Sequence, residues 1–243
     1  MAMPQIAHVR QSFNENIHDE DVVWALQLHE SRRQLQWCLP ALRASYPCSR
    51  VVVISDGDSD DYEDLVQQYH CDYVTGQHLM TLSTCHLYVE RLFRALLAGT
   101  ETYCIKIDPD TRIWRRFARL PAFSCIFGTL ETITEGHGSE ILFPANVQGG
   151  CIGMTRDAVE EMCSSGLLTA ETCSAASRTT WARCEDMVAT VAAGRFCDDF
   201  VISWLASQLH IPIVESAEIR SRWRRRVQQT RELRFAVTHP HKI

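Results

Sequence analysis

The sequence of 243 residues has no run that approaches the roughly 20 uninterrupted apolar residues of a membrane-spanning helix. Its first residues, MAMPQIAHVRQSFNENIHDED, lack the basic start and the apolar block of a secretory signal peptide. We therefore expect no transmembrane segment and no export signal. A cytoplasmic location is the expectation that follows.

Paired cysteines are also missing. The chain has 11 cysteines, yet no two form a Cys-x-x-Cys pair, a spacing that fits neither a zinc site nor a disulfide framework. Cys104, Cys125 and Cys151 lie inside apolar runs, where a thiol behaves as a small hydrophobic group. This pattern predicts reduced cysteines in the core of a cytosolic protein.

Several common functional motifs are absent. The sequence has no Gly-x-Gly-x-x-Gly, no P-loop and no Gly-x-Ser-x-Gly. The acidic segment DGDSDD does not form a calcium loop of the EF-hand type, because Asp61 stands where glycine is needed and Gln67 where glutamate is needed. Dinucleotide binding, P-loop chemistry and calcium sensing are therefore not expected.

The charge is unevenly distributed. A net charge of −6 argues against nucleic-acid binding by the whole protein. Residues 220–234, however, contain seven arginines and one glutamate. Such a segment is either a solvated helix face or a surface that contacts phosphates or another anionic partner, and both interpretations stay open.

Apolar runs alternate with helical patterns through the first half of the chain. Strands are expected at Val22–Leu28, Arg50–Ser55, Asp72–Thr75 and Tyr103–Ile107, with helices after Ser31, over Asp61–Tyr69 and over Thr84–Ala98. Further strands are expected at Phe123–Leu130, at Cys151–Met154 and in the IPIV and RFAV segments, and helices at Arg156–Cys163 and Phe200–Leu209. Pro40 is expected to kink or shorten the first helix. This alternation predicts an α/β fold with a mostly parallel central sheet flanked by helices.

Acidic residues follow two of the expected strands. Asp56 ends the strand RVVVIS, and Asp108 and Asp110 follow the strand YCIKI. Ligands of such sheets bind beyond the carboxyl ends of the strands. Asp108 and Asp110 are therefore candidate ligands of Mn²⁺ or Mg²⁺, which bind carboxylate oxygens and can bridge to phosphate oxygens, although an aspartate pair around a proline is also a common turn.

Two further groups of side chains are candidates for the same site. One of His239 and His241, near the end of the chain, could complete the metal site, because imidazole is the commonest protein metal ligand. Asp198 and Asp199 open an expected helix, where a carboxylate could act as a general base. Electrostatic preference for a helix N-terminus explains an aspartate pair there equally well. The pair Glu185-Asp186 competes for the role of base.

Taken in order, five segments resemble the GT-A glycosyltransferases, particularly their inverting family 2-like group. They are LHESRRQLQWCLPALRASYP, VVVISDGDSDD, YCIKIDPDT, GGCIGMTRDAVEEM and CDDFVISWL. The resemblance covers about residues 22–209 and implies a single GT-A (Rossmann-like) domain. It implies a nucleotide-sugar-binding half over about residues 20–112, an acceptor-side half over about 113–210, and an Arg-rich arm over 211–243 that returns to the active site.

The resemblance also implies roles for individual residues. Nucleotide-sugar-binding residues would be His29, Glu30, Asp56, Arg91 and Asp108; the acceptor side would include Gly149 and Gly150; Asp199, or failing that Asp198, would be the catalytic base; and the metal ligands would be Asp108, Asp110, His239 and His241. His29-Glu30 replaces the Tyr-Asn pair of the family, which leaves the base-binding turn open.

The expected reaction is metal-dependent transfer of a sugar from a nucleotide diphosphate donor, with UDP as the expected nucleotide. The first hypothesis is an inverting transfer with an aspartate as the general base, and the alternative is a retaining mechanism that uses Arg91. A nucleotidyltransferase is a rival, but its Gly-rich loop is missing from LHESRR; a non-catalytic nucleotide-sugar-binding protein is another. The acceptor, whether saccharide, small molecule or peptide, is not defined by the sequence.

Overall fold

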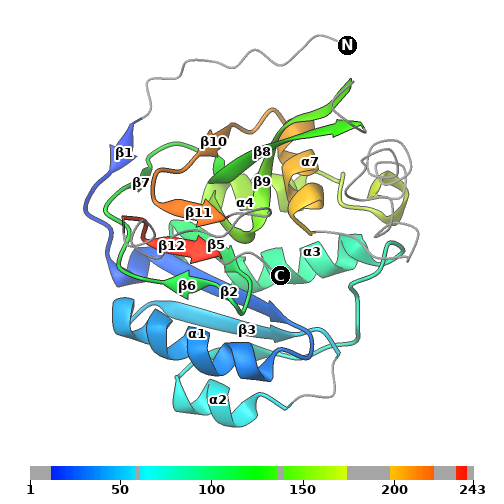
Figure 1. Cartoon of the computed structure of the whole chain (residues 1–243). Coiled ribbons are helices and arrows are strands. Elements are labelled where there is room, and N and C mark those ends of the chain that lie inside the picture. Colours follow the sequence, from blue (N-terminus) through cyan, green and yellow to red (C-terminus); the bar gives the residue numbers. More distant parts are fainter. Residues whose placement is uncertain (1–11, 58–60, 136–139, 174–197, 222–233, 240–243) are drawn as a thin grey trace.

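The computed structural model describes residues 12–57, 61–135, 140–173, 198–221 and 234–239. Its centre is a seven-stranded sheet in the order β10-β8-β9-β5-β2-β3-β4 (Figure 1). The parallel part consists of β2 (Val22–Leu28), β3 (Arg50–Ser55), β4 (Asp72–Val74) and β5 (Tyr103–Ile107).

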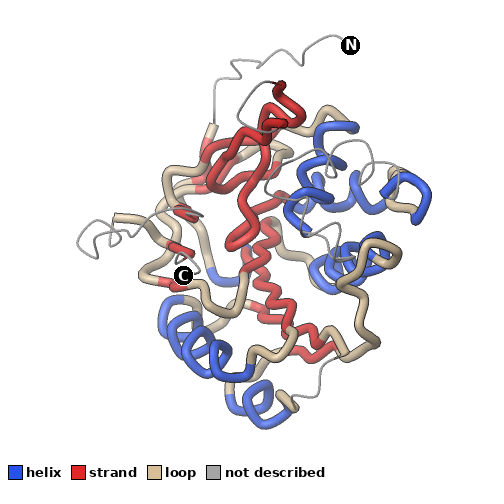
Figure 2. The backbone as a smooth tube through the Cα atoms, turned by 45° about the vertical axis from the view of Figure 1, so that its right-hand side comes forward, coloured by secondary structure: helices blue, strands red, loops and turns tan. Residues whose placement is uncertain are grey.

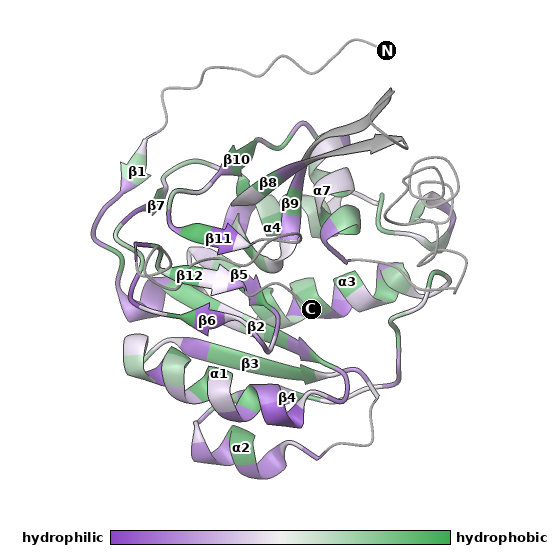
Figure 3. Cartoon of the chain, viewed as in Figure 1, coloured by the Kyte–Doolittle hydropathy of each residue, from purple (hydrophilic) through white to green (hydrophobic). Residues whose placement is uncertain are grey.

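Helices cover both faces of this sheet, and Figure 2 shows the strands between them. One face carries α1 (Arg32–Ser45) and α2 (Glu63–Gln68); the other carries α3 (Cys85–Leu97), α4 (Arg156–Ser164) and α7 (Asp198–Gln208). Because both faces are covered, the central strands are mostly apolar (Figure 3), as expected for a parallel sheet. In β2, Val23 and Ala25 enter one apolar cluster and Trp24 enters the other.

The strand β9 (Glu140–Thr155) runs antiparallel to both of its neighbours. It forms a hairpin with β8 (Ile126–Glu135), and β10 (Ile213–Glu215) then pairs with β8 in parallel. The fold is therefore α/β with a mixed, mostly parallel sheet, which confirms the fold class expected from the sequence.

A second sheet brings the end of the described chain back to the centre. It joins β11 (Ile219–Ser221), β12 (Val237–His239) and β6 (Arg112–Ile113), with β12 between the other two. Because β6 begins just after Asp110, this sheet places β12 beside the acidic loop that follows β5. The short strands β1 (Phe13–Asn14) and β7 (Leu120–Pro121) pair with each other, and a 3₁₀ turn, η1 (Asp19–Asp21), precedes β2.

The strands expected at Val22–Leu28, Arg50–Ser55 and Tyr103–Ile107 are confirmed residue for residue. Four expectations need correction. The helix α1 continues through Pro40 to Ser45, and the backbone amide of Tyr46 still donates to the carbonyl of Leu42 at 2.7 Å.

The other three corrections concern strand boundaries. The strand expected at Cys151–Met154 is only the last part of β9, which begins at Glu140. In RFAV only Val237 is in a strand, because the amides of Ala236 and Val237 both donate to the carbonyl of Glu218 and β12 begins there. The strand expected at Phe123–Leu130 begins at Ile126 and extends to Glu135, since its outer part pairs with β9 rather than with the central strands.

Among the described residues, no helix is long and apolar enough to span a membrane. The cysteines in the same part of the chain are free thiols, and most of them are buried or partly buried. Burial raises the pKa of the Cys104 and Cys125 thiols to about 12, so both remain protonated core side chains.

Candidate functional site

Two aspartates and one histidine meet at the carboxyl end of β5. His239 Nε2 lies 2.9 Å from Asp110 Oδ1 and 3.4 Å from Asp108 Oδ2. One ligand atom from each of the three residues lies within 4.8 Å of the others. The loop itself is fixed to β9, because the Asp108 amide and the Thr111 hydroxyl both donate to the Gly150 carbonyl, at 3.1 and 2.7 Å.

This set of ligand atoms fits a divalent metal ion. Carboxylate oxygens suit Mg²⁺ and Mn²⁺, and the imidazole nitrogen favours Mn²⁺ over the harder Mg²⁺. Burial lowers the pKa of His239, but its hydrogen bonds to Asp108 and Asp110 outweigh burial and raise the pKa to about 9. Burial alone would raise the pKa of Asp108, but the Lys106 charge and His239 hold it well below its usual range. The Asp108 carboxylate is therefore ionised at neutral pH.

Gly150 and Gly149 are the points at which β9 approaches two functional side chains. A Cβ added to Gly150 would lie 2.1 Å from Cγ of His239, a distance that non-bonded carbons do not reach. A Cβ added to Gly149 would lie 3.1 Å from Oδ2 of Asp199. The glycine pair, assigned from sequence to the acceptor side, thus lies between two groups of side chains. They are the candidate metal-binding cluster of Asp108, Asp110 and His239 and the aspartate pair Asp198-Asp199.

Lys106 is a central residue of the site that the sequence analysis did not identify. It is only 3% exposed, and its Nζ lies 2.7 Å from Asp108 Oδ1 and 2.9 Å from Asp198 Oδ2. The same ammonium donates to the Gly149 carbonyl at 2.9 Å. Burial lowers the pKa of Lys106, but the two carboxylates outweigh it and hold the pKa well above its usual value. A lysine inside the apolar strand YCIKI was the available signal, since a buried charge requires partners.

Asp198 and Asp199 open α7 on the other side of Lys106, but their surroundings differ. Asp198 forms the ion pair with Lys106. Asp199 makes no ion pair within the described residues; its Oδ2 accepts the Gly149 amide at 3.0 Å and its Oδ1 accepts the Phe200 amide at 2.9 Å. Burial, followed by the neighbouring charge of Asp198, raises the pKa of Asp199 to about 7. With a pKa of about 7, the Asp199 carboxyl group can exchange a proton near neutral pH.

Asp56 lies at the end of β3 and is 1% exposed. Its carboxylate accepts the backbone amides of Leu79 and Met80 at 2.9 and 3.1 Å and is paired with the guanidinium of Arg91. His78 Nδ1 also lies 2.9 Å from Asp56 Oδ2. The structure therefore places the predicted residues Asp56 and Arg91 in direct contact and adds His78 to them.

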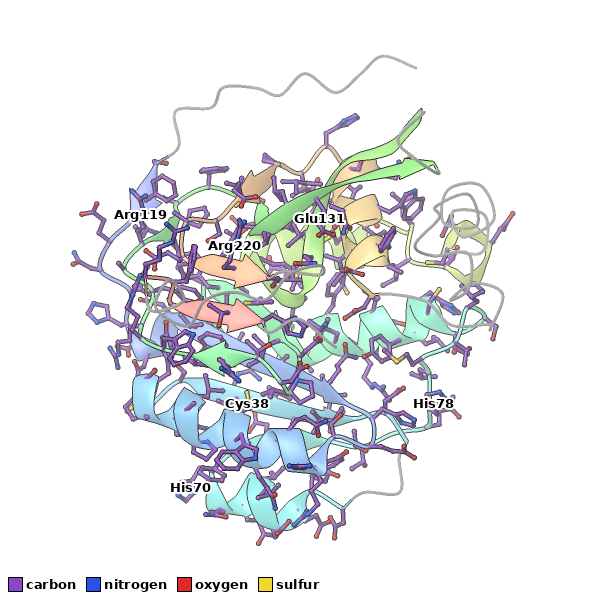
Figure 4. The ribbon with its side chains drawn as sticks, viewed as in Figure 1. Cys38, His70, His78, Arg119, Glu131 and Arg220 are labelled. Carbon is purple, nitrogen blue, oxygen red and sulfur yellow. The ribbon has the colours of Figure 1, made fainter. Side chains whose placement is uncertain are left out.

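The predicted turn His29-Glu30 follows β2 at the same edge of the sheet. The ring of His29 lies 4.7 Å, centroid to centroid, from that of His78, which Figure 4 labels in the segment between β4 and α3. Glu30 is exposed and has a positive φ of 49°. Of the predicted nucleotide-sugar-binding residues, His29, Glu30, Asp56 and Arg91 thus gather around the ends of β2 and β3, whereas Asp108 follows β5.

Three predictions concern residues outside the described part of the chain. His241 follows the last described residue, His239. Most of the Arg-rich segment 220–234 and the competing pair Glu185-Asp186 also lie there. These predictions stay as the sequence analysis left them.

Comparison with solved structures identifies the architecture. The mannosyltransferase PcManGT from Pyrobaculum calidifontis, in complex with GDP-Man and Mn²⁺, matches 85% of this chain with a TM-score of 0.50 and 10% identity. The chain has the GT-A fold. It covers 57% of PcManGT, so it spans little more than half of that protein. TarS from S. aureus matches 38% of this chain and 17% of its own, with 15% identity and a TM-score of 0.32, which is too low to support a conclusion.

Searches by sequence add nothing to this GT-A assignment. No protein-family model matches the chain, and no curated protein matches it.

Proposed function

We propose that this GT-A protein is a glycosyltransferase that moves a sugar from a nucleotide diphosphate donor to an acceptor hydroxyl. The observation that carries the proposal is the cluster of Asp108, Asp110 and His239 beside a second carboxylate, Asp199, whose pKa is near neutrality. Both lie at the carboxyl edge of the sheet, where ligands of such folds bind.

Asp108, Asp110 and His239 would hold Mn²⁺, which supplies charge that offsets the negative charge of a leaving diphosphate. PcManGT contains both GDP-Man and Mn²⁺, which supports a metal-dependent donor site in this fold. Lys106 keeps Asp108 ionised and oriented through its 2.7 Å ion pair. The nucleotide would lie toward Asp56 and Arg91, at the ends of β2 and β3.

Asp199 would be the general base of an inverting transfer. Each of its oxygens accepts one backbone amide, so each keeps a lone pair for an acceptor hydroxyl. The hydroxyl oxygen forms a bond to the anomeric carbon, Asp199 takes the hydroxyl proton, and the bond between the anomeric carbon and the phosphate oxygen breaks. Asp198 is a poorer base, because its carboxylate is paired with Lys106.

No observation favours the retaining alternative. The guanidinium of Arg91 is engaged by Asp56 and by the carbonyl of Gln77, the latter at 3.1 Å. Its first role is therefore to hold Asp56 in place.

The proposal is tested by thermal shift with UDP-, GDP- and TDP-sugars, each with and without MnCl₂. A ligand at 100 times its Kd stabilises the folded state by about 2.7 kcal/mol. For a domain of this size that corresponds to a rise in Tm of roughly 5–10 °C. We expect this rise with at least one donor and only when Mn²⁺ is present, followed by nucleotide release in the same mixture.

Asp110→Asn is the matched variant, because it keeps the side-chain shape and removes the charge. It should abolish the Mn²⁺-dependent rise while its Tm without ligand changes little. Equal stabilisation of this variant would contradict the metal site. Stabilisation by nucleoside triphosphates alone would favour a nucleotidyltransferase, and donor binding without nucleotide release would favour a non-catalytic binding protein.

A further inference from the structure

One face of the β8–β9 hairpin carries buried polar groups that nothing above explains. Cys151 on β9 pairs with Ile107, the last residue of β5. Because β9 runs antiparallel to β5, the residues before Cys151 extend past the carboxyl end of β5. Asn146 and Gln148, which are still part of the sheet through pairing with β8, therefore lie beyond the carboxyl end of β5, where the metal-binding cluster is found.

The two amide side chains point away from α7. Val147, between them, belongs to the apolar cluster shared with α7, and its amide donates to Ser203 Oγ at 3.0 Å. Side chains alternate along a strand, so Asn146 and Gln148 lie on the opposite face. There Glu131 of β8 pairs with Asn146, and Gln148 Nε2 donates to Glu131 Oε1 at 3.1 Å.

Both amides leave a buried oxygen without a partner. Asn146 is 1% and Gln148 is 6% exposed, and no group within the described chain donates to Asn146 Oδ1 or Gln148 Oε1. A carboxylate can only accept from Gln148, so the Nε2 of Gln148 faces Glu131 and Oε1 faces away from it. A buried acceptor without a donor is costly, so these oxygens are suited to receive hydrogen bonds from a bound molecule.

A third buried oxygen without a partner among the described residues, Ser221 Oγ, lies between this face and the metal-binding cluster. The strand β11 lies over β8, where the Ser221 amide donates to Thr129 Oγ1 at 2.8 Å. Figure 4 shows Glu131 on β8 and Arg220 on β11 in this region. Ser221 is the strand partner of His239, and its buried Oγ also has no partner in the described part of the chain.

We propose that Asn146, Gln148 and Ser221 form a hydroxyl-recognition site for the sugar ring of the donor. The inference rests on the proposed glycosyl transfer. In the order β9-β5-β2-β3, the Asp56–Arg91 pair that would hold the nucleotide and the β9 face lie on opposite sides of the metal-binding cluster at the end of β5. The group attached beyond the diphosphate therefore reaches β9. Sugar hydroxyls supply the O–H donors that two amide oxygens and a serine oxygen can accept.

The test separates recognition of the sugar from recognition of the nucleotide. Binding of UDP, UDP-glucose, UDP-galactose, GDP and GDP-mannose is measured by calorimetry with saturating Mn²⁺, in the wild type and in Gln148→Leu, Asn146→Leu and Ser221→Ala. For the preferred donor, the ratio of nucleotide Kd to donor Kd reports the contribution of the sugar. Each variant should lower this ratio by about 3- to 10-fold, the effect of one lost hydrogen bond, while the Kd of the free nucleotide is unchanged.

Gln27→Leu is the control, because Gln27 is also 6% exposed and also has an unpartnered Oε1, but lies on β2. It should leave the ratio within about twofold of the wild type, a difference smaller than one hydrogen bond contributes. An unchanged ratio in all three site variants, or a wild-type ratio of one, overturns the proposal even if the protein transfers sugar. Absence of any nucleotide binding overturns the proposed function, and this inference falls with it.

Discussion

The contact between Gly150 and His239 allows the metal site to be tested by adding a single methyl group. In Gly150→Ala the new Cβ would meet Cγ of His239 at 2.1 Å and its Cβ at 2.5 Å. Carbon atoms pack at about 3.5–4.0 Å, so the imidazole would have to move by roughly 1.5 Å. Metal–ligand distances tolerate only about ±0.2 Å. His239 would therefore leave the ligand set, and we expect Mn²⁺ affinity to fall at least about 10- to 100-fold, as for disrupted metal sites generally.

The assay is Mn²⁺ binding by calorimetry, together with urea denaturation. Overpacking at Gly150 should cost about 1–3 kcal/mol of folding free energy, so the variant is expected to remain folded. Gly149→Ala is the matched comparison, because its Cβ would meet Asp199 Oδ2 at a tight but nearly tolerable 3.1 Å. It should keep Mn²⁺ affinity near that of the wild type. If Gly150→Ala binds Mn²⁺ within about twofold of the wild type, His239 is not held as a metal ligand and the reasoning fails.

Three other predictions follow from the charges around the site. Mn²⁺ can bind only the neutral imidazole of His239, whose pKa is about 9 without metal. Mn²⁺ binding should therefore release about one proton at pH 7, and the Mn²⁺ affinity should increase as the pH rises toward 9. Calorimetry in buffers of different ionisation enthalpy measures the number of protons released. Asp199 must be ionised to act as a base, and a bound cation lowers its metal-free pKa of about 7, so the acid limb of the kcat–pH profile should lie at or below pH 7. Asp198→Asn removes the neighbouring negative charge and should shift this limb to lower pH. Lys106→Met leaves two carboxylates without their buried partner and should lower the free energy of unfolding by about 3–5 kcal/mol in urea; a loss below about 1 kcal/mol would contradict this role.

The central strands and the acidic loops could be predicted from the sequence because each depends on local pattern. A strand buried on both faces is a largely apolar run, and VVWALQL, RVVVIS and YCIKI are such runs. The position of Asp56 and Asp108 at strand ends follows directly, and the parallel arrangement then places them at one edge of the sheet. The order of strands and helices along the chain was therefore sufficient to predict where Asp56 and Asp108 lie.

The pairing of distant short strands could not be predicted in the same way. The three-residue strands β11 and β12 contain too few residues for a period to be recognised, and His239 reaches Asp110 only because β12 pairs with β6. The sequence could name His239 as a candidate, but not distinguish a ligand from a solvated histidine near a chain end. The close approach of β9 at Gly150 is likewise a tertiary contact, which the pair Gly149-Gly150 marks without identifying its partner.

Lys106 explains why two adjacent aspartates on one helix are not equivalent. Sequence alone left Asp198 and Asp199 open for the role of base, since both are carboxylates at the start of α7. The buried ammonium forms an ion pair with only Asp198, at 2.9 Å, and that same ion pair leaves the negative charge of Asp198 next to Asp199. One lysine thus contacts Asp108 of the candidate metal site, Asp198 at the start of α7 and the Gly149 carbonyl of β9. Asp199, the proposed base, does not form an ion pair with this lysine, but its neighbour Asp198 does. A change at Lys106 should therefore alter both the Mn²⁺ affinity and the pH dependence of Asp199.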